Sequence, residues 1–192
     1  MVLGLVAAAA LLIAAIRFPA WNNAEPQPAG APPETAPAYR EITWDDLLPK
    51  DWDPMQAFKG LDFSKLGDND PKAIKALRTL KNVWDNAPIE TSLDGQSIRL
   101  AGFAIPLDSQ NQHVSEALLV PYFGACIHSP PPPANQVIHV VFKTPVKDMR
   151  TMDAFWIGGV LTGERGDSGL GVHGYRLAAE RVEPYVFDEE KP

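Results

Sequence analysis

Residues 121–136 hold the side chains of this chain that are best suited to chemistry. Cys126 is the only cysteine of the 192 residues, and His128 follows it two positions later. Four consecutive prolines at positions 130–133 then restrict the backbone. A thiolate and an imidazole are good ligands for zinc or copper. Residues two apart in an extended backbone point to the same side, so Cys126 and His128 could reach one ion.

Two more histidines are candidates for the same ion. His139 falls in a predicted strand, in phase with Val137 and Val141, and would lie beside the preceding strand if the prolines turn the chain back. His173 precedes the last predicted strand on a glycine-rich loop. Thiolate with imidazoles is a ligand set of zinc or copper, so a metal site is expected. The predicted metal ligands are Cys126, His128, His139 and His173.

Other interpretations of these residues stay open. A lone cysteine is often a small buried apolar residue, and the proline run could be a rigid structural loop or a docking surface. A nucleophilic enzyme would use Cys126 with His128 or His139 as its base. No serine elbow, phosphate-binding loop, dinucleotide fingerprint or HExxH pattern occurs, so we predict no catalytic residue. His113 lies on a polar turn and is expected at the surface.

The composition is that of a globular protein with an acidic balance. The hydrophobic fraction is 45%, which is enough for one domain with a buried core. The formal net charge is −7, whereas binding to nucleic-acid phosphates needs clustered Lys and Arg. The charge therefore argues against a nucleic-acid partner.

The start of the chain predicts export. Residues 1–16 are almost purely apolar, and Arg17 follows them. This run has the length of a signal-peptide core, but no Lys or Arg precedes it. We predict a signal peptide or membrane anchor over residues 1–24, with a periplasmic domain. An anchor in the reverse orientation, with a cytoplasmic domain, is the alternative. Residues 25–39, rich in Ala and Pro, predict a disordered linker, residues 40–187 a single folded domain and residues 188–192 a tail.

The folded region is predicted to begin with helical elements. Thr43 is expected to cap a helical turn that docks Trp44 and Leu47 on the core. Asp70 and Pro71 begin a helix that ends near Asn86, with apolar residues at helical spacing. We expect this helix to cover an opening of the domain that follows.

Five β-rich segments follow and predict a mainly β fold. They span residues 96–106, 116–123, 136–142, 155–162 and 175–182, with turns between them at 108–112, 130–133, 144–145 and 163–174. Gly102, Gly158 and Gly159 suit the bends of a coiled sheet. The fold class is therefore a small five-stranded OB-like barrel with an N-terminal helical segment packed on it. A two-sheet sandwich is the alternative.

Several segments resemble a bacterial family of exported domains of unknown function. The likeness rests on Pro121-Tyr122-Phe123-Gly124-Ala125-Cys126-Ile127-His128, on the proline run with Asn135-Gln136, and on shorter matches at residues 44–49, 84–88, 102–107 and 174–177. The resemblance implies a periplasmic protein or lipoprotein, although this chain has no lipobox cysteine near its start. Some members are similar to accessory components encoded beside an ABC transporter and a periplasmic zinc-binding protein.

The resemblance and the ligand pattern together predict a non-catalytic zinc-binding or transport-accessory protein. Its expected partner is a periplasmic zinc-binding protein or the permease of an ABC transporter. A metal-free interaction module, using the Cys-Pro loop as its docking surface, is the alternative function.

Overall fold

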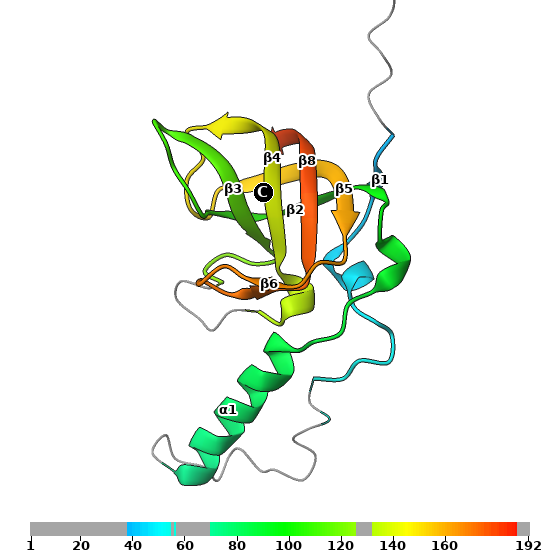
Figure 1. Ribbon diagram of the computed structural model, residues 1–192, viewed down its shortest axis with the longest axis vertical. Helices are drawn as coiled ribbons and strands as arrows, with labels where there is room; N and C mark the ends of the chain where they lie inside the picture. Colours follow the sequence, from blue (N-terminus) through cyan, green and yellow to red (C-terminus); the bar gives the residue numbers. More distant parts are fainter. Residues whose placement is uncertain (1–37, 55, 57–69, 126–131, 188–192) are drawn as a thin grey trace, which may run out of the picture. The chain divides into compact units, whose positions relative to one another are not determined.

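Five strands form a closed barrel (Figure 1). The structure is a computed structural model, and it describes residues 38–54, 56, 70–125 and 132–187. Neighbouring strands run β2-β3-β4-β8-β5, and β5 pairs with β2 to close the ring. Among these pairs β4–β8 is parallel and the other four are antiparallel. This order and these directions are those of an OB-type Greek-key barrel, so the predicted fold class is confirmed. The strands are β2 (Ser97–Pro106), β3 (His113–Val120), β4 (Ile138–Lys147), β5 (Ala154–Thr162) and β8 (Tyr175–Pro184).

The barrel interior is filled by alternate residues of each strand. Leu100 of β2, Leu119 of β3, Val140 of β4, Ile157 of β5 and Leu177 of β8 all belong to one core cluster and are at most 2% exposed. Successive strand residues point to opposite faces, so the residues between them lie on the outside of the barrel. His139 is one of these outward residues, between the buried Ile138 and Val140.

A glycine pair in β5 marks a bend, as the sequence predicted. The pairing of β5 with β8 shifts register between Gly158 and Gly159. A Cβ at Gly159 would lie 2.2 Å from the carbonyl oxygen of Ala178, so a side chain there would push the two strands apart. Glycine is therefore required for the close approach at this bulge.

Strand boundaries in β3 and β4 differ from the sequence prediction. The strand predicted to reach Phe123 ends at Val120. The turn predicted at Thr144 and Pro145 lies inside β4, which continues to Lys147. The pairing of β3 with β4 shifts register between Val114 and Glu116, opposite this part of β4. An irregular ladder tolerates a proline, which cannot donate a hydrogen bond.

The N-terminal helical segment packs on the barrel. The short strand β1 (Arg40–Glu41) pairs in parallel with β2, and the 3-10 helix η1 (Trp44–Leu47) follows. The Asp46 carboxylate accepts hydrogen bonds from the backbone N–H and the hydroxyl of Thr43 at 2.7 and 2.8 Å, which closes the first turn. Leu47 is fully buried in the core cluster, as predicted.

Helix α1 (Pro71–Asp85) begins where the sequence predicted, with the Asp70 side chain accepting from the backbone N–H of Lys72. Its apolar residues Ile74 and Leu77 are 42% and 64% exposed. These two side chains therefore do not close an opening of the barrel, which corrects the expectation for this helix. Among the described residues, no helix has both the length and the apolar composition to span a membrane.

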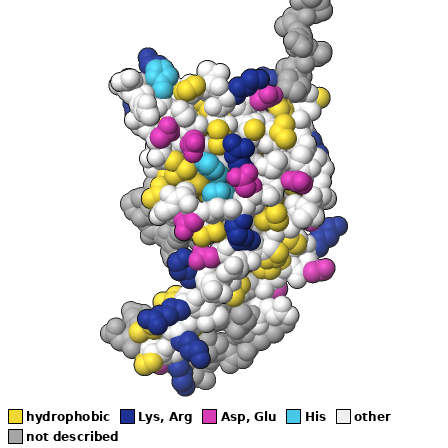
Figure 2. All heavy atoms as spheres, viewed as in Figure 1, with side chains coloured by type: hydrophobic (Ala, Val, Ile, Leu, Met, Phe, Trp, Pro, Cys, Tyr) yellow, Lys and Arg dark blue, Asp and Glu magenta, His cyan; other side chains and the backbone are white. Residues whose placement is uncertain are grey.

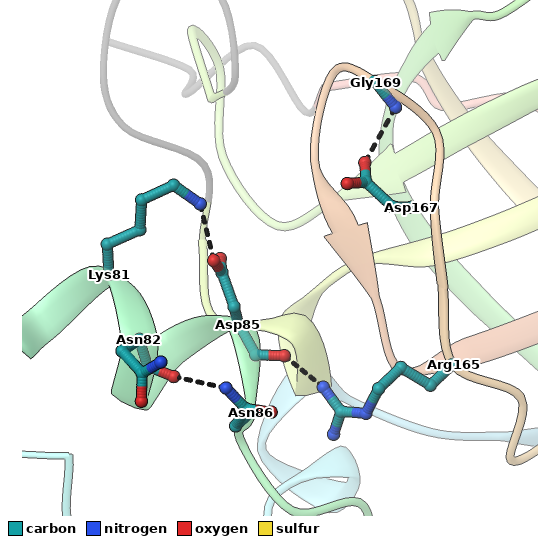
Figure 3. A network of polar contacts seen from close by, with 7 residues as sticks. All are labelled: Lys81, Asn82, Asp85, Asn86, Arg165, Asp167 and Gly169. Carbon is teal, nitrogen blue, oxygen red and sulfur yellow. Dashed lines mark hydrogen bonds and ion pairs between the residues drawn. The ribbon is translucent and has the colours of Figure 1, made fainter. Parts of the chain in front are cut away.

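The last turn of α1 is held by the side chain of Arg165, which is distant in sequence. Arg165 donates one hydrogen bond to the carbonyl oxygen of Asp85 (Figure 3). It donates a second to the carbonyl oxygen of Ala87. Carbonyls at the end of a helix have no partner within the helix, and a cation there also suits the helix dipole. Arg165 therefore caps α1 and ties it to the connection between β5 and β8.

Candidate functional site

The two described histidines among the predicted ligands, His139 and His173, lie side by side. Their ring centroids are 5.0 Å apart, and the rings are tilted by 45°. His139 comes from β4, and His173 from β7 (Val172–His173), a short strand that pairs with β6 (Gly166–Asp167). Figure 2 shows histidine side chains near the middle of the face that it draws, with apolar, acidic and basic side chains around them. The structure therefore brings these two of the four predicted residues together.

Glu116 orients the first histidine. Its Oε2 lies 2.9 Å from Nε2 of His139, across the adjacent strands β3 and β4. The His139 side chain is 18% exposed, so this contact is partly shielded from water. A carboxylate that accepts from one ring nitrogen fixes the tautomer and the orientation of the ring, and here it leaves Nδ1 as the nitrogen with the lone pair.

His173 is buried, and one of its ring nitrogens lacks a hydrogen-bond partner. The residue is 6% exposed, and its Nδ1 is buried with no hydrogen-bond partner. Burial, and secondarily the neighbouring His139, lower the pKa of the His173 imidazole below its ordinary value. The ring is therefore neutral near pH 7, which is the form that binds metals. A buried polar atom without a partner costs free energy, so a ligand that used this nitrogen would recover some of that cost.

Gly166 leaves the space in which the His173 ring lies. The two residues are opposite each other in the β6–β7 pair. A Cβ at Gly166 would lie 2.6 Å from both Cε1 and Nε2 of His173. The ring can therefore lie over the backbone of β6 only because residue 166 has no side chain.

A second apolar cluster, here called the outer cluster, lies next to this site on the outside of the barrel. Its buried members are Ile105, Leu118, Val120, Ala125 and Val137. Leu118 pairs with His139 across β3 and β4, and Ala125 directly precedes Cys126. The outer cluster therefore holds the chain just before the predicted thiol ligand.

The chain after the proline run is hydrogen-bonded to the chain beside His173. Ala134, at the start of the 3-10 helix η5 (Ala134–Gln136), accepts a hydrogen bond at 2.6 Å from the backbone N–H of Gly174, the neighbour of His173. Asn135 is fully buried and donates to the carbonyl of Pro88. Both described flanks of residues 126–131 are thus anchored.

The remaining predicted ligands, Cys126 and His128, lie outside the described residues. Within the described part of the chain, no three His, Cys, Asp or Glu side chains form a group that could hold a metal ion. His113 is exposed, and its Nδ1 lies 2.9 Å from the carbonyl oxygen of Asn111, which confirms it as a surface residue.

Sequence reasoning missed two residues of the site, Glu116 and Gly166. Glu116 faces His139 because of the strand register, and that register includes a bulge that no sequence pattern announces. Gly166 was counted only as part of a glycine-rich loop. The two-residue strands β6 and β7, which bring it to His173, are too short to show periodicity.

Comparison with known proteins gives a family without a function. The family model described as "Protein of unknown function (DUF3299)" matches residues 44–184. A crystal structure of a DUF3299 family protein (PA4066) from Pseudomonas aeruginosa PAO1 is similar, with 34% sequence identity and a TM-score of 0.62. That match covers 79% of this chain and 99% of the other. No curated protein matches the chain.

Proposed function

The chain belongs to the DUF3299 family of proteins of unknown function, and we propose that it is a non-catalytic metal-binding protein whose ion is zinc. One observation carries the proposal. The unpartnered Nδ1 of a buried, neutral His173 lies beside His139, whose ring is oriented by Glu116. Paired imidazoles backed by a carboxylate are a common arrangement around zinc.

Two imidazoles are half of a tetrahedral zinc site. The described residues supply His139 and His173, and a stable site needs further ligands. The predicted ones are Cys126 and His128, which join the chain between the anchored flanks at Ala125 and Ala134. A thiolate would bring the stronger zinc affinity, and the two histidines on β4 and β7 would position the ion.

We further propose that the protein acts in the periplasm as an accessory to an ABC-type transporter. The apolar N-terminal segment and the family resemblance of residues 121–136 support this setting. In this role it would exchange zinc with a periplasmic zinc-binding protein rather than transform a substrate.

A metal-free interaction module is the second candidate. Tyr122 and Phe123, just before the Cys-Pro loop, are 44% and 69% exposed. Exposed aromatic side chains are enriched at binding surfaces, so the loop and these rings would form a docking surface. The two candidates differ in metal content.

The test is zinc binding by the full chain, purified without a chelator or a polyhistidine tag. Metal content would be measured by elemental analysis, and affinity by competition with a zinc-binding dye. His139→Gln and His173→Gln should each weaken zinc binding at least about tenfold, as should Cys126→Ser. His113→Gln, at an exposed histidine outside the site, is the matched control and should bind like the parent.

The outcome separates the candidates. One equivalent of zinc that depends on His139 and His173 supports the metal site. The metal site is rejected if His113→Gln loses as much zinc as the His139 and His173 variants do. It is also rejected if the folded parent binds no zinc above background, and either result leaves the interaction module.

A further inference from the structure

Four aromatic side chains line a hollow of about 200 Å³ on the outside of the barrel, here called the aromatic hollow. They come from three parts of the chain: η1, β2 and the segment just after β8, which supplies two of them. The other lining residues are small or apolar, and none of the lining residues is charged. The aromatic residues are Trp44, Phe103, Tyr185 and Phe187, and the others are Ala101, Gly102, Pro121 and Ala154.

Two of the four aromatic residues of the hollow, Trp44 and Tyr185, are held by hydrogen bonds before any ligand binds. The indole N–H of Trp44 donates to the carbonyl oxygen of Ala101 at 2.8 Å. A Cβ at Gly102 would lie 2.9 Å from the Trp44 ring, so the glycine permits the indole to lie close over β2. The backbone N–H of Tyr185 donates to the carbonyl oxygen of Ala154 at 2.9 Å. A site with fixed walls loses little conformational entropy on binding.

The rings are arranged at angles to one another. Tyr185 and Phe187 are 5.0 Å apart with an interplanar angle of 66°, and Phe187 and Phe103 are 6.4 Å apart at 27°. Phe187 is 62% exposed, so this side of the aromatic hollow is open to solvent. Aromatic walls at several orientations around a small open space can contact a rounded group from more than one side.

We propose that the aromatic hollow binds a quaternary ammonium group, the cationic headgroup of choline-like compounds. The face of an aromatic ring carries negative potential and attracts cations within about 6 Å of its centre. The lining has no Lys or Arg to repel a cation, and the net charge of −7 favours cations over anions near the protein. The volume is below the roughly 300 Å³ of the smallest drug-sized pockets, which suits a headgroup.

The lining also argues against other ligands of similar size. The N–H of Trp44 is already bonded to Ala101, which leaves the hydroxyl of Tyr185 as the polar side-chain group of the lining. A sugar or a primary ammonium buries several hydroxyl or N–H groups that need partners. A trimethylammonium group has no N–H donor, so it can enter an aromatic site without leaving a hydrogen bond unmade.

The same row of rings already holds one cation. Tyr185 also contacts Trp156, at 5.7 Å between centroids, and the guanidinium carbon of Arg99 lies 4.5 Å from the Trp156 ring centre. The Arg99 charge is paired with Glu41 at 2.8 Å, which limits its repulsion of a second cation. The neighbouring contact shows that the face of one ring in this row, that of Trp156, lies against a positive charge.

The test compares two probes of the same shape. Choline chloride and its neutral isostere 3,3-dimethylbutan-1-ol would be titrated into the full chain at constant ionic strength. Binding would be followed by calorimetry and by the indole N–H resonances in NMR spectra. About three cation–π contacts at the exposed value predict saturation by choline with a dissociation constant of roughly 10 mM or lower. The neutral isostere should bind at least about fivefold more weakly. Equal affinities, or no saturation by choline, would overturn the proposal.

Variants locate the binding. Phe187→Leu and Tyr185→Leu should each weaken choline binding about two- to fivefold, because each removes one ring and keeps an apolar side chain. Tyr39→Leu is the matched control, because this ring lies beside Gly158 and does not line the aromatic hollow. A control variant that loses as much affinity as Phe187→Leu, or Phe187 and Tyr185 variants that lose none, would also contradict the assignment.

Discussion

The hydroxyl of Tyr175 donates a hydrogen bond to the carbonyl oxygen of Leu47 at 2.7 Å, although the two residues are 128 positions apart. The same hydroxyl accepts a hydrogen bond at 2.6 Å from the backbone N–H of Glu90. Tyr175 is 1% exposed, and Leu47 is fully buried. One side chain at the start of β8 therefore joins the end of η1 to the chain that follows α1.

Replacing Tyr175 by Phe should lower the free energy of unfolding by about 1 to 3 kcal/mol. The ring would still fill its place, but the Leu47 carbonyl and the Glu90 N–H would both lose a partner. Urea unfolding at pH 7 measures the difference. Tyr39→Phe, which removes a long hydrogen bond of 3.5 Å at an exposed site, is the control and should change stability by less than about 0.5 kcal/mol.

The same tyrosine gives a prediction at high pH. Burial raises the pKa of Tyr175 from 10.0 to about 12. Between these values the unfolded chain releases the phenol proton while the folded chain keeps it, so stability falls as pH rises through this window. The stability difference between the parent and Tyr175→Phe should therefore shrink above pH 10. A difference that stays constant from pH 9 to pH 11.5 would show that the hydroxyl is not what stabilises the parent.

Asp46→Asn tests the start of η1 through acid pH. Hydrogen bonds from the backbone N–H and hydroxyl of Thr43 lower the pKa of the Asp46 carboxyl below 3.8. The folded state therefore gains stability from ionised Asp46 above pH 3.8 and loses it as pH falls below that value. At pH 7 the substitution should cost about 0.5 to 1 kcal/mol, the usual range for a modest helix cap. Parallel unfolding curves at pH 7 and pH 3 should show that cost become smaller at the lower pH.

The barrel was predictable from the sequence because local patterns carry most of its information. Alternating apolar residues located the five strands, and Gly159 marked a bend where β8 leaves no room for a side chain. The proposed neighbourhood of His139 and β3 followed from the proline run, which lies between β3 and β4. Each of these inferences needs only a few consecutive residues.

The parts that escaped prediction depend on register or on distant segments. Pro145 suggested a turn, but the bulge beside Val114 accommodates it within β4. Glu116 meets His139 only because of that same irregular register. The aromatic hollow gathers rings from positions between 44 and 187, which no local pattern connects. The apolar period predicted helix α1, but a period does not show whether the apolar face is buried, and Ile74 and Leu77 are exposed.

Arg165→Met tests how α1 is attached. The substitution keeps an aliphatic stem but removes the donors to the carbonyl oxygens of Asp85 and Ala87. Hydrogen exchange should therefore become faster in the last turn of α1, while the amides of β4 and β8 stay as protected as in the parent. Global stability should fall by about 1 to 2 kcal/mol, since the lost hydrogen bonds come from a charged group. Unchanged exchange at residues 82–87 would show that Arg165 does not hold this end of the helix.

Gly166→Ala tests whether the position of the His173 ring matters for the metal. The added Cβ would lie 2.6 Å from two atoms of that ring, so the imidazole or the β6–β7 pair must shift. A small overpacking of this kind should cost about 1 to 3 kcal/mol in the free energy of unfolding. If zinc uses His173, the same variant should also weaken zinc binding several-fold, because ligands displaced by a few tenths of an ångström leave the preferred distance.

Zinc affinity and thermal unfolding would be measured on the same preparation, at a temperature where the variant is fully folded. The His173 ring resonances report the displacement directly. A variant whose His173 resonances move while its zinc affinity equals that of the parent would remove this histidine from the ligand set.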